Sequence, residues 1–432
     1  MYRVWSLVGS YSVLLLTGAL VALVWANLDP ASYRYMVEFP LWFNGLVGSD
    51  ASAWLAAHGD LHGIDYIGNT TRVLTVRFVV NGILMACFFA IAGKEVWEGL
   101  ALRQGALRGR KAATPLFATA GGMIGPAAVY LGLAALLGSD LYDALARGWA
   151  VPAATDIALS YVLGRAIFGA GHPALRFLLF IAIVDDLAAM LAVSTLYPSD
   201  ALAPQWLLLP LAAALAAFFL FNWLPRRMDR GRQLRPACTF LRRRLSFWPY
   251  LAAGAVSWFG VHQSGLHPAL GLLPIIPAIP HADRAFGLFS EAEQYLTDIL
   301  NRIEQLLKRP VAVILFLFGL TNAGVDLGAV GAATGLVLAG FLVGKPLGVI
   351  VFGWLAARPL GLGLPAGMRG ADLAVAGSVA AVGFTVPLIA AAAAFGMESG
   401  HEAAKLGAIL SLAAALVALV AARLLKVEKI SS

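Results

Sequence analysis

Four ionisable side chains stand out inside the apolar runs of this sequence: Asp156, Asp185, Asp186 and Lys345. An ionisable group in hydrocarbon is costly, so such groups are rare and mark functional sites by default. Carboxylate oxygens bind protons and hard cations, and a buried ammonium needs a carboxylate partner to stay charged. These residue types therefore predict a centre that handles small cations inside a membrane.

The two adjacent carboxylates, Asp185 and Asp186, lie near the middle of an apolar run that reaches from Phe180 to Met190 and beyond. Neighbouring positions on a helix point about 100° apart, so the two side chains face different neighbours. Two like charges this close do not both stay ionised cheaply. The pair can hold a proton or a hard cation in competition. The alternative is a pair neutralised by internal hydrogen bonds that serves folding alone.

A third carboxylate, Asp156, follows Pro152 and Thr155 in another apolar run. Proline cannot donate a backbone hydrogen bond, and threonine and aspartate can cap a helix end. The pattern predicts an interrupted span, although a simple kink with a buried aspartate is the alternative. Half-helices in the membrane leave unpaired backbone groups and exposed dipole ends, which are tolerable only around a wet cavity. A carboxylate beside the positive ends is the expected compensation.

A second interruption is expected at Gly383, Thr385 and Pro387. The buried lysine lies in Gly344-Lys-Pro-Leu-Gly348, where the glycines and the proline favour an irregular centre over a lysine that reaches to the interface. Residues 112–197 and 328–425 then form two units of three spans, each with a broken middle helix. Three is odd, so the second unit has the opposite orientation, as in the inverted repeats of secondary transporters.

The composition of the whole chain supports this setting. Of its 432 residues 60% are hydrophobic and 13% charged, and the mean hydropathy is +0.79. A soluble protein of this size cannot bury so much apolar surface. The composition predicts an all-α polytopic membrane protein and excludes soluble binding modules, nucleic-acid binding and a Cys/His metal site.

Apolar runs of about 20 residues are long enough for a helix to span the membrane. About twelve runs are expected, near 5–27, 74–98, 112–138, 147–165, 174–197, 201–224, 247–263, 266–280, 296–322, 328–357, 371–396 and 402–425.

The basic residues indicate how the chain crosses the membrane. With a cytoplasmic N-terminus, most of the 31 lysines and arginines fall on the cytoplasmic side, as the positive-inside rule requires. Both termini are then cytoplasmic, and residues 1–432 form one transmembrane domain. The Arg-rich segment 225–246 becomes a cytoplasmic loop that contacts anionic lipid headgroups. The segment 29–72 becomes an extracytoplasmic loop whose short extended stretches could form a hairpin used in self-association.

These motifs resemble the NhaA-type sodium/proton antiporters over about residues 88–421. Five motifs in order carry the resemblance: Gly148-Trp-Ala-Val-Pro-Ala-Ala-Thr-Asp-Ile-Ala158, Val184-Asp-Asp-Leu187, Asn322-Ala-Gly-Val325, Gly344-Lys-Pro-Leu-Gly348 and Gly383-Phe-Thr385. The resemblance implies a fold in which two broken helices, with Gly383 and Thr385 in the second, cross at mid-membrane. It also implies a homodimer in a bacterial inner membrane.

The resemblance assigns roles to single residues. Asp186 would be the main cation ligand, and Asp185 the neighbour that carries the proton; the two together make up the metal site. Lys345 would pair with Asp185 in the cation-free state. Asp156 and Thr155 would support the crossing and the ion.

The resemblance extends to positions linked to pH regulation, where this sequence departs from the family pattern. Glu95 and Glu304 match family glutamates. Glu98 stands where an arginine is familiar, and Gln305 and Lys308 occupy positions where histidines are known. Because histidine titrates nearest neutrality, the resemblance does not fix the pH at which exchange switches on. Glu95, Glu304 and Lys308 are the candidate pH-regulating residues.

The sequence therefore predicts a transporter rather than an enzyme, one that needs no cofactor. The expected function is export of Na⁺ or Li⁺ in exchange for H⁺ by alternating access, electrogenic and regulated by pH. The alternative within transport is a sodium-coupled symporter of an organic solute. Two other classes are an intramembrane aspartyl protease built on Asp156 and Asp185, and a channel that conducts without coupling.

Overall fold

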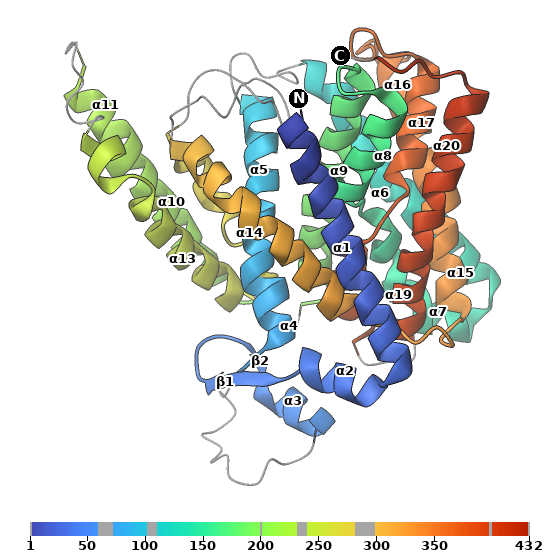
Figure 1. Ribbon diagram of the computed structural model, residues 1–432, viewed down its shortest axis with the longest axis horizontal. Helices are drawn as coiled ribbons and strands as arrows, with labels where there is room; N and C mark the ends of the chain where they lie inside the picture. The colour runs from blue at the N-terminus through green and yellow to red at the C-terminus, as the bar shows by residue number, and fades with distance from the viewer. Residues whose placement is uncertain are drawn as a thin grey trace.

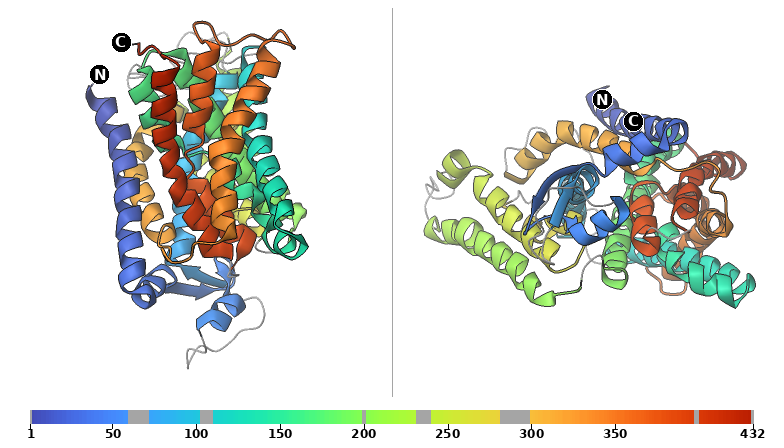
Figure 2. Two further views of the ribbon diagram at one scale, coloured as in Figure 1. Left: turned by 90° about the vertical axis from the view of Figure 1, so that its right-hand side faces the viewer. Right: turned by 90° about the horizontal axis from the view of Figure 1, so that it is seen from below.

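A computed structural model describes residues 2–58, 72–101, 110–198, 201–230, 240–280, 299–396 and 400–430. These segments are mostly helical and stand side by side in a bundle (Figure 1). The N- and C-termini lie at one end of the bundle, and a small β-sheet lies at the other (Figure 2). The arrangement suits a chain that crosses a membrane an even number of times.

The first part of the described chain contains a long helix, a small sheet and a second long helical span. The sheet is antiparallel, with strand order β1-β3-β2, and pairs Phe43 with Val73 and Ser49 with Val73. The sheet therefore joins the two ends of the connection between the first two long helical segments. The elements are α1 (Tyr2–Leu28), α2 (Pro30–Val37), β1 (Pro40–Asn44), β2 (Ser49–Asp50), α3 (Ala51–His58), β3 (Arg72–Thr75), α4 (Val76–Phe78), the π-helical turn η2 (Val79–Leu84) and α5 (Met85–Ala101).

The second part contains the first interrupted helix and, after it, the helix that carries the paired aspartates. The elements are α6 (Arg110–Leu136), α7 (Ser139–Leu145), the 3-10 helix η3 (Ala146–Ala153), α8 (Ile157–Phe168) and α9 (Pro173–Leu196). The two sides of the interruption are bent by 52° with respect to each other.

The third part includes an arm that leans away from the rest of the bundle at the left of Figure 1, made by α10, α11 and α13. Its elements are η4 (Pro204–Leu207), α10 (Leu208–Phe218), η5 (Phe219–Trp223), α11 (Leu224–Met228), η6 (Leu241–Leu245), α13 (Trp248–Gln263), η7 (Pro268–Leu270) and η8 (Leu273–Ala278), followed by α14 (Ile299–Asn322), which packs along α1.

The last part contains the second interrupted helix, which is also bent by 52°. Its elements are α15 (Ala332–Ala339), η10 (Gly340–Gly344), α16 (Lys345–Ala357), α17 (Gly370–Ala380), α18 (Thr385–Phe395), α19 (Gly400–Leu410), η11 (Ser411–Ala413) and α20 (Ala414–Leu424). The two bent pairs confirm the interruptions that Pro152 and Gly383 predict.

Length and apolarity identify fewer candidate membrane crossings in the described residues than the predicted twelve. Within the described ranges, six helices pass both criteria, and the two bent pairs bring the count to eight. Three further apolar helical stretches are shorter within the residues searched: Ser12–Leu28 inside the longer α1, Pro268–Ala278, and Pro310–Asn322 inside the longer α14. The chain is polytopic as predicted, but the count of twelve is not confirmed by these criteria.

Close contact between α6 and α16 fixes the helix that begins with Lys345. A Cβ atom on Gly121 would overlap the carbonyl oxygen of Gly348, and one on Gly125 would overlap that of Gly344. The glycines lie four apart on each helix, so they form one row and let the two backbones touch. This contact holds the first turn of α16 against α6.

We expect Gly121→Ala to destabilise the protein by roughly 1–3 kcal/mol, because the added methyl group forces the two backbones apart. Gly132→Ala on the same helix is the matched control. Its Cβ would meet no atom of the described residues within 4 Å, so Gly132→Ala should gain about 0.5–1 kcal/mol from the better helix propensity of alanine. Thermal unfolding in detergent measures both variants. Equal melting temperatures for the two would contradict the proposed contact.

Candidate functional site

The first interruption is organised by Asp156. The backbone leaves η3 at Ala153 and runs extended until α8 starts at Ile157. The Asp156 carboxylate caps α8 by accepting a hydrogen bond from the Leu159 amide at 2.7 Å. The positive end of α8 therefore begins in the interior of the bundle, beside a carboxylate, as the sequence predicts.

The second interruption meets the first. The Asp156 amide donates to the Val382 carbonyl at 2.9 Å, and the other Asp156 carboxylate oxygen accepts from the Thr385 amide at 3.2 Å. Thr385 is the first residue of α18. One fully buried carboxylate thus accepts hydrogen bonds at the N-terminal ends of α8 and α18, and two helix dipoles point their positive ends at it.

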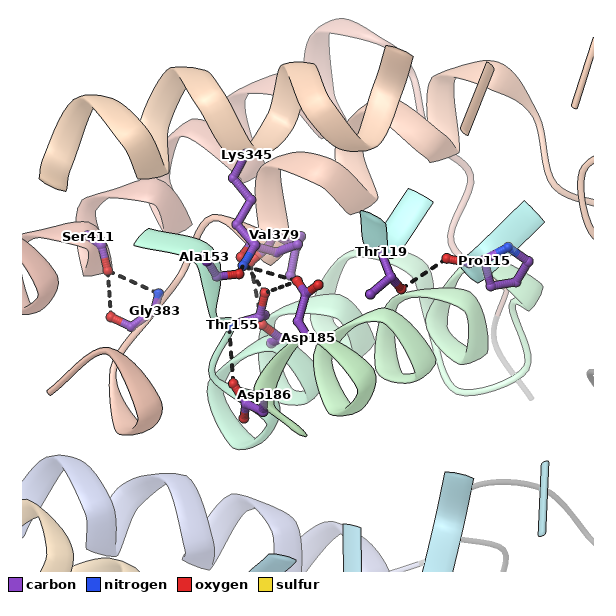
Figure 3. A network of polar contacts seen from close by, with 12 residues as sticks. Pro115, Thr119, Ala153, Thr155, Asp185, Asp186, Lys345, Val379, Gly383 and Ser411 are labelled. Carbon is purple, nitrogen blue, oxygen red and sulfur yellow. Dashed lines mark hydrogen bonds and ion pairs between the residues drawn. The ribbon is translucent and has the colours of Figure 1, made fainter. Parts of the chain in front are cut away.

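The paired aspartates on α9 face the first interruption (Figure 3). The Thr155 amide donates to Asp186 Oδ1 at 3.2 Å, and the Thr155 hydroxyl lies 3.1 Å from Asp185 Oδ2. The same hydroxyl lies 3.0 Å from the Ala380 carbonyl oxygen of α17. Thr155 therefore contacts both aspartates and the second broken helix.

Lys345 reaches the same point from α16. Its Nζ atom lies 3.0 Å from Asp185 Oδ2 and donates a hydrogen bond to the Ala153 carbonyl oxygen. Ala153 ends η3, so the ammonium also offsets the negative end of that half-helix. Lys345 and both aspartates are completely buried. In this conformation Asp185, rather than Asp156, is the ion-pair partner of Lys345.

The site keeps carboxylate oxygens available for a ligand. Asp185 Oδ1 and Asp186 Oδ2 are buried, and neither has a hydrogen-bond partner among the residues that the structure describes. A buried acceptor without a partner is costly, so such atoms in a folded protein call for a ligand or a proton. Carboxylate oxygens are the kind of ligand that a small hard cation prefers.

The candidate pH-regulating residues do not join this cluster. Glu95 lies near the end of α5, buried, with its carboxylate 3.9 Å from Lys94 Nζ. The same lysine lies 3.1 Å from Glu98, so the carboxylate that stands in place of the familiar arginine has a cationic partner one turn away. Glu304 and Lys308 belong to α14, but their side chains lie outside the described residues.

Two functional contacts are not found by sequence reasoning. The Ala153 carbonyl oxygen binds Lys345, and the Ser411 hydroxyl binds Gly383 in the second interruption. A backbone carbonyl carries no residue signature. Ser411 is a single hydroxyl in an otherwise apolar run, which is a weak signal in the sequence. Only the structure shows that it lies opposite Gly383.

Comparisons with known proteins agree with this geometry. Residues 6–425 match the family model described as Na+/H+ antiporter 1. The chain is 56% identical to the Na(+)/H(+) antiporter NhaA of Jannaschia sp. (strain CCS1) over 99% of both chains. It is 39% identical to the Na(+)/H(+) antiporter NhaA of Geobacter sulfurreducens and 40% identical to the Na(+)/H(+) antiporter NhaA 2 of Pelobacter propionicus, over 98% of each chain. With its broken helices and buried acidic pair, the chain belongs to the Na+/H+ antiporter 1 family.

Proposed function

We propose that this protein exchanges Na⁺ for H⁺ across a membrane, at one site built from Asp185 and Asp186 with Thr155, Asp156 and Lys345 around them. The observation that carries the proposal is the pair of buried carboxylate oxygens that have no hydrogen-bond partner among the described residues. They belong to the acidic pair whose Asp185 already contacts the Lys345 ammonium. Names of full-length relatives support the choice of ions.

The exchange follows from competition for the same oxygens. When the carboxylates are deprotonated, Na⁺ binds Asp186 and then displaces the Lys345 ammonium from Asp185. When protons bind, they neutralise the carboxylates and release the cation. Because two ligands cannot hold the same oxygens at once, binding of one excludes the other. Alternate exposure of the site to the two sides then gives coupled exchange.

Asp156 and Thr155 have the same structural role throughout this cycle. Asp156 compensates the ends of α8 and α18, so its charge stabilises the crossing. Thr155 links the two carboxylates to that crossing by its amide and its hydroxyl. Gly383 and Thr385 provide the backbone of the second helix at the same point. No bound cofactor is required for these steps.

Two further properties belong to this proposal. With two protons for each Na⁺, one net charge crosses per cycle, and a membrane potential contributes about 2.3 kcal/mol per 100 mV. Regulation by pH would involve Glu95, Glu304 and Lys308. The Lys94–Glu98 contact supports an altered pH range, because it changes the charges around Glu95.

The proposed location is a bacterial inner membrane, with both termini in the cytoplasm. The bias of basic residues and the position of both termini at one end of the bundle support this orientation (Figure 1).

A homodimer is proposed, with the small sheet as its interface. β1 is an edge strand, and its Leu41 and Trp42 are 52% and 63% exposed, so they could be covered by a second copy.

We expect Na⁺ and Li⁺, but not K⁺, to release protons from sealed vesicles that contain the purified protein and a preformed pH gradient. Carboxylate oxygens bind small hard cations well, so we expect Na⁺ and Li⁺ to compete with protons better than the larger K⁺ does. A fluorescent pH indicator follows the gradient as each salt is added, without any added cofactor. Protein-free vesicles are the control.

The same assay separates the alternatives. Sodium uptake that requires an organic solute and releases no proton would favour the symporter. Electrical current without a fixed ratio of the two ions would favour a channel. Either result would contradict the proposed exchange.

A further inference from the structure

We infer that Ser411 is a positioning residue for ion exchange, which holds the second interruption in register with the site. The inference rests on the crossing being the ion site, as proposed above. Ser411 opens η11, the short 3-10 segment between α19 and α20, and its side chain is completely buried. Figure 3 shows it facing Gly383, on the side of the broken helix away from Asp185.

Ser411 hydrogen-bonds to the backbone of the second interruption, where the regular hydrogen bonds of a helix are broken. The Gly383 amide donates to Ser411 Oγ at 3.0 Å. The hydroxyl lies 2.7 Å from the Gly383 carbonyl oxygen and 2.6 Å from that of Ala408, and its one proton serves either acceptor. A buried amide without a partner is costly, so this hydroxyl determines where Gly383 can stay.

Gly383 cannot shift without consequences for the site. A Cβ atom there would overlap the Phe341 ring, so this part of the backbone is tightly enclosed. The Val382 carbonyl, one residue before, accepts from the Asp156 amide, and the Thr385 amide, two residues after, donates to the Asp156 carboxylate. A displacement of Gly383 therefore changes both contacts of Asp156 with the second helix.

In each of the two interruptions, a side chain from a following helical segment accepts a hydrogen bond from a backbone amide. In the first, a side chain of the next helix, Asp186 on α9, accepts from the Thr155 amide. In the second, a side chain of the next helical segment, Ser411 between α19 and α20, accepts from the Gly383 amide. One acceptor is a carboxylate and the other a neutral hydroxyl. The second interruption thus receives the same backbone support without a second anionic site that could hold a cation or a proton.

The test replaces Ser411 by alanine and uses Ser194→Ala as the matched control. The Ser194 hydroxyl is also buried, donates to the Met190 carbonyl of its own helix and accepts the His267 amide at 3.1 Å. Within the described residues, the Ser194 hydroxyl makes no hydrogen bond with either interruption. Both variants lose a comparable hydroxyl, so a general loss of stability affects both.

We expect two changes in Ser411→Ala that the control does not show. Hydrogen exchange at the amides of residues 381–384 becomes faster, because the acceptor of the Gly383 amide is gone. The apparent KM for Na⁺ in vesicles rises about tenfold, which corresponds to about 1.4 kcal/mol, with a smaller change in kcat. Ser411→Thr, which keeps the hydroxyl, restores both values.

Three outcomes would overturn the inference. These are unchanged hydrogen exchange at residues 381–384, equal KM changes in Ser411→Ala and Ser194→Ala, or no rescue by threonine in a folded variant. Should Ser411→Ala fail to fold, Ser411→Thr with native exchange and native KM still supports the hydroxyl, and a raised KM in that variant contradicts it. Failure of the proposed ion site would show separately, because an Asp186→Asn variant would then still exchange ions fully.

Discussion

Asp186→Asn is expected to abolish Na⁺/H⁺ exchange, to the level of protein-free vesicles, while the protein still folds. Asparagine keeps an oxygen that can accept from the Thr155 amide, so the support of the first interruption is retained. It can neither carry the negative charge that binds a cation nor take up a proton at neutral pH. Exchange is measured by proton release on addition of Na⁺, and folding by thermal unfolding in detergent.

Asp372→Asn is the matched control for this experiment. Asp372 is also completely buried and also has a carboxylate oxygen, Oδ1, without a partner in the described part of the chain. Its other oxygen accepts from the Arg369 amide at the start of α17, away from the crossing. We expect this variant to exchange ions normally. Equal losses in both variants would mean that any buried aspartate is needed for the fold, and full exchange by Asp186→Asn would refute the site.

Lys345→Met is expected to lower the free energy of unfolding by about 3–5 kcal/mol, because it leaves the buried Asp185 charge without its partner. The Nζ–Oδ2 distance is 3.0 Å and both groups are completely buried. Removing one partner of such a buried ion pair strongly destabilises the fold. The Ala153 carbonyl oxygen also loses its donor. Thermal unfolding in detergent measures the loss.

The double variant Asp185→Asn/Lys345→Met should recover most of that stability. Removing both charges eliminates the uncompensated carboxylate, and the Thr155 hydroxyl can still donate to the asparagine oxygen. A double variant as unstable as Lys345→Met alone would show that the lysine acts through packing and the Ala153 contact rather than through Asp185.

The sequence predicts the residues of the candidate site better than their mutual contacts. Asp185, Asp186 and Lys345 are conspicuous because charged groups in apolar runs are costly, and Pro152 marks the first interruption because it lacks an amide hydrogen. The pairing of Lys345 with Asp185 rather than Asp156 joins residues far apart in the chain. It depends on how α16 packs against α6, which local pattern does not encode.

Other parts of the fold are less predictable for different reasons. The count of twelve crossings is not confirmed, and apolarity does not reveal where a run forms short helices, as at η7 and η8. Ser411 is missed because a lone hydroxyl is equally suited to bonding its own helix, as Ser194 does with Met190. Its role depends on which backbone lies opposite, and only tertiary structure decides that.

The shared cap at Asp156 has a consequence for biogenesis. Its partner on the second helix, Thr385, follows 229 residues later in the chain. At about 5–20 residues per second, a ribosome needs on the order of tens of seconds to make that stretch. During this interval the newly inserted first half holds a carboxylate with only one of its two amide groups in place. The centre of the molecule is therefore completed only after residue 385 has been made, and a nascent chain that stalls before that residue leaves it unfinished.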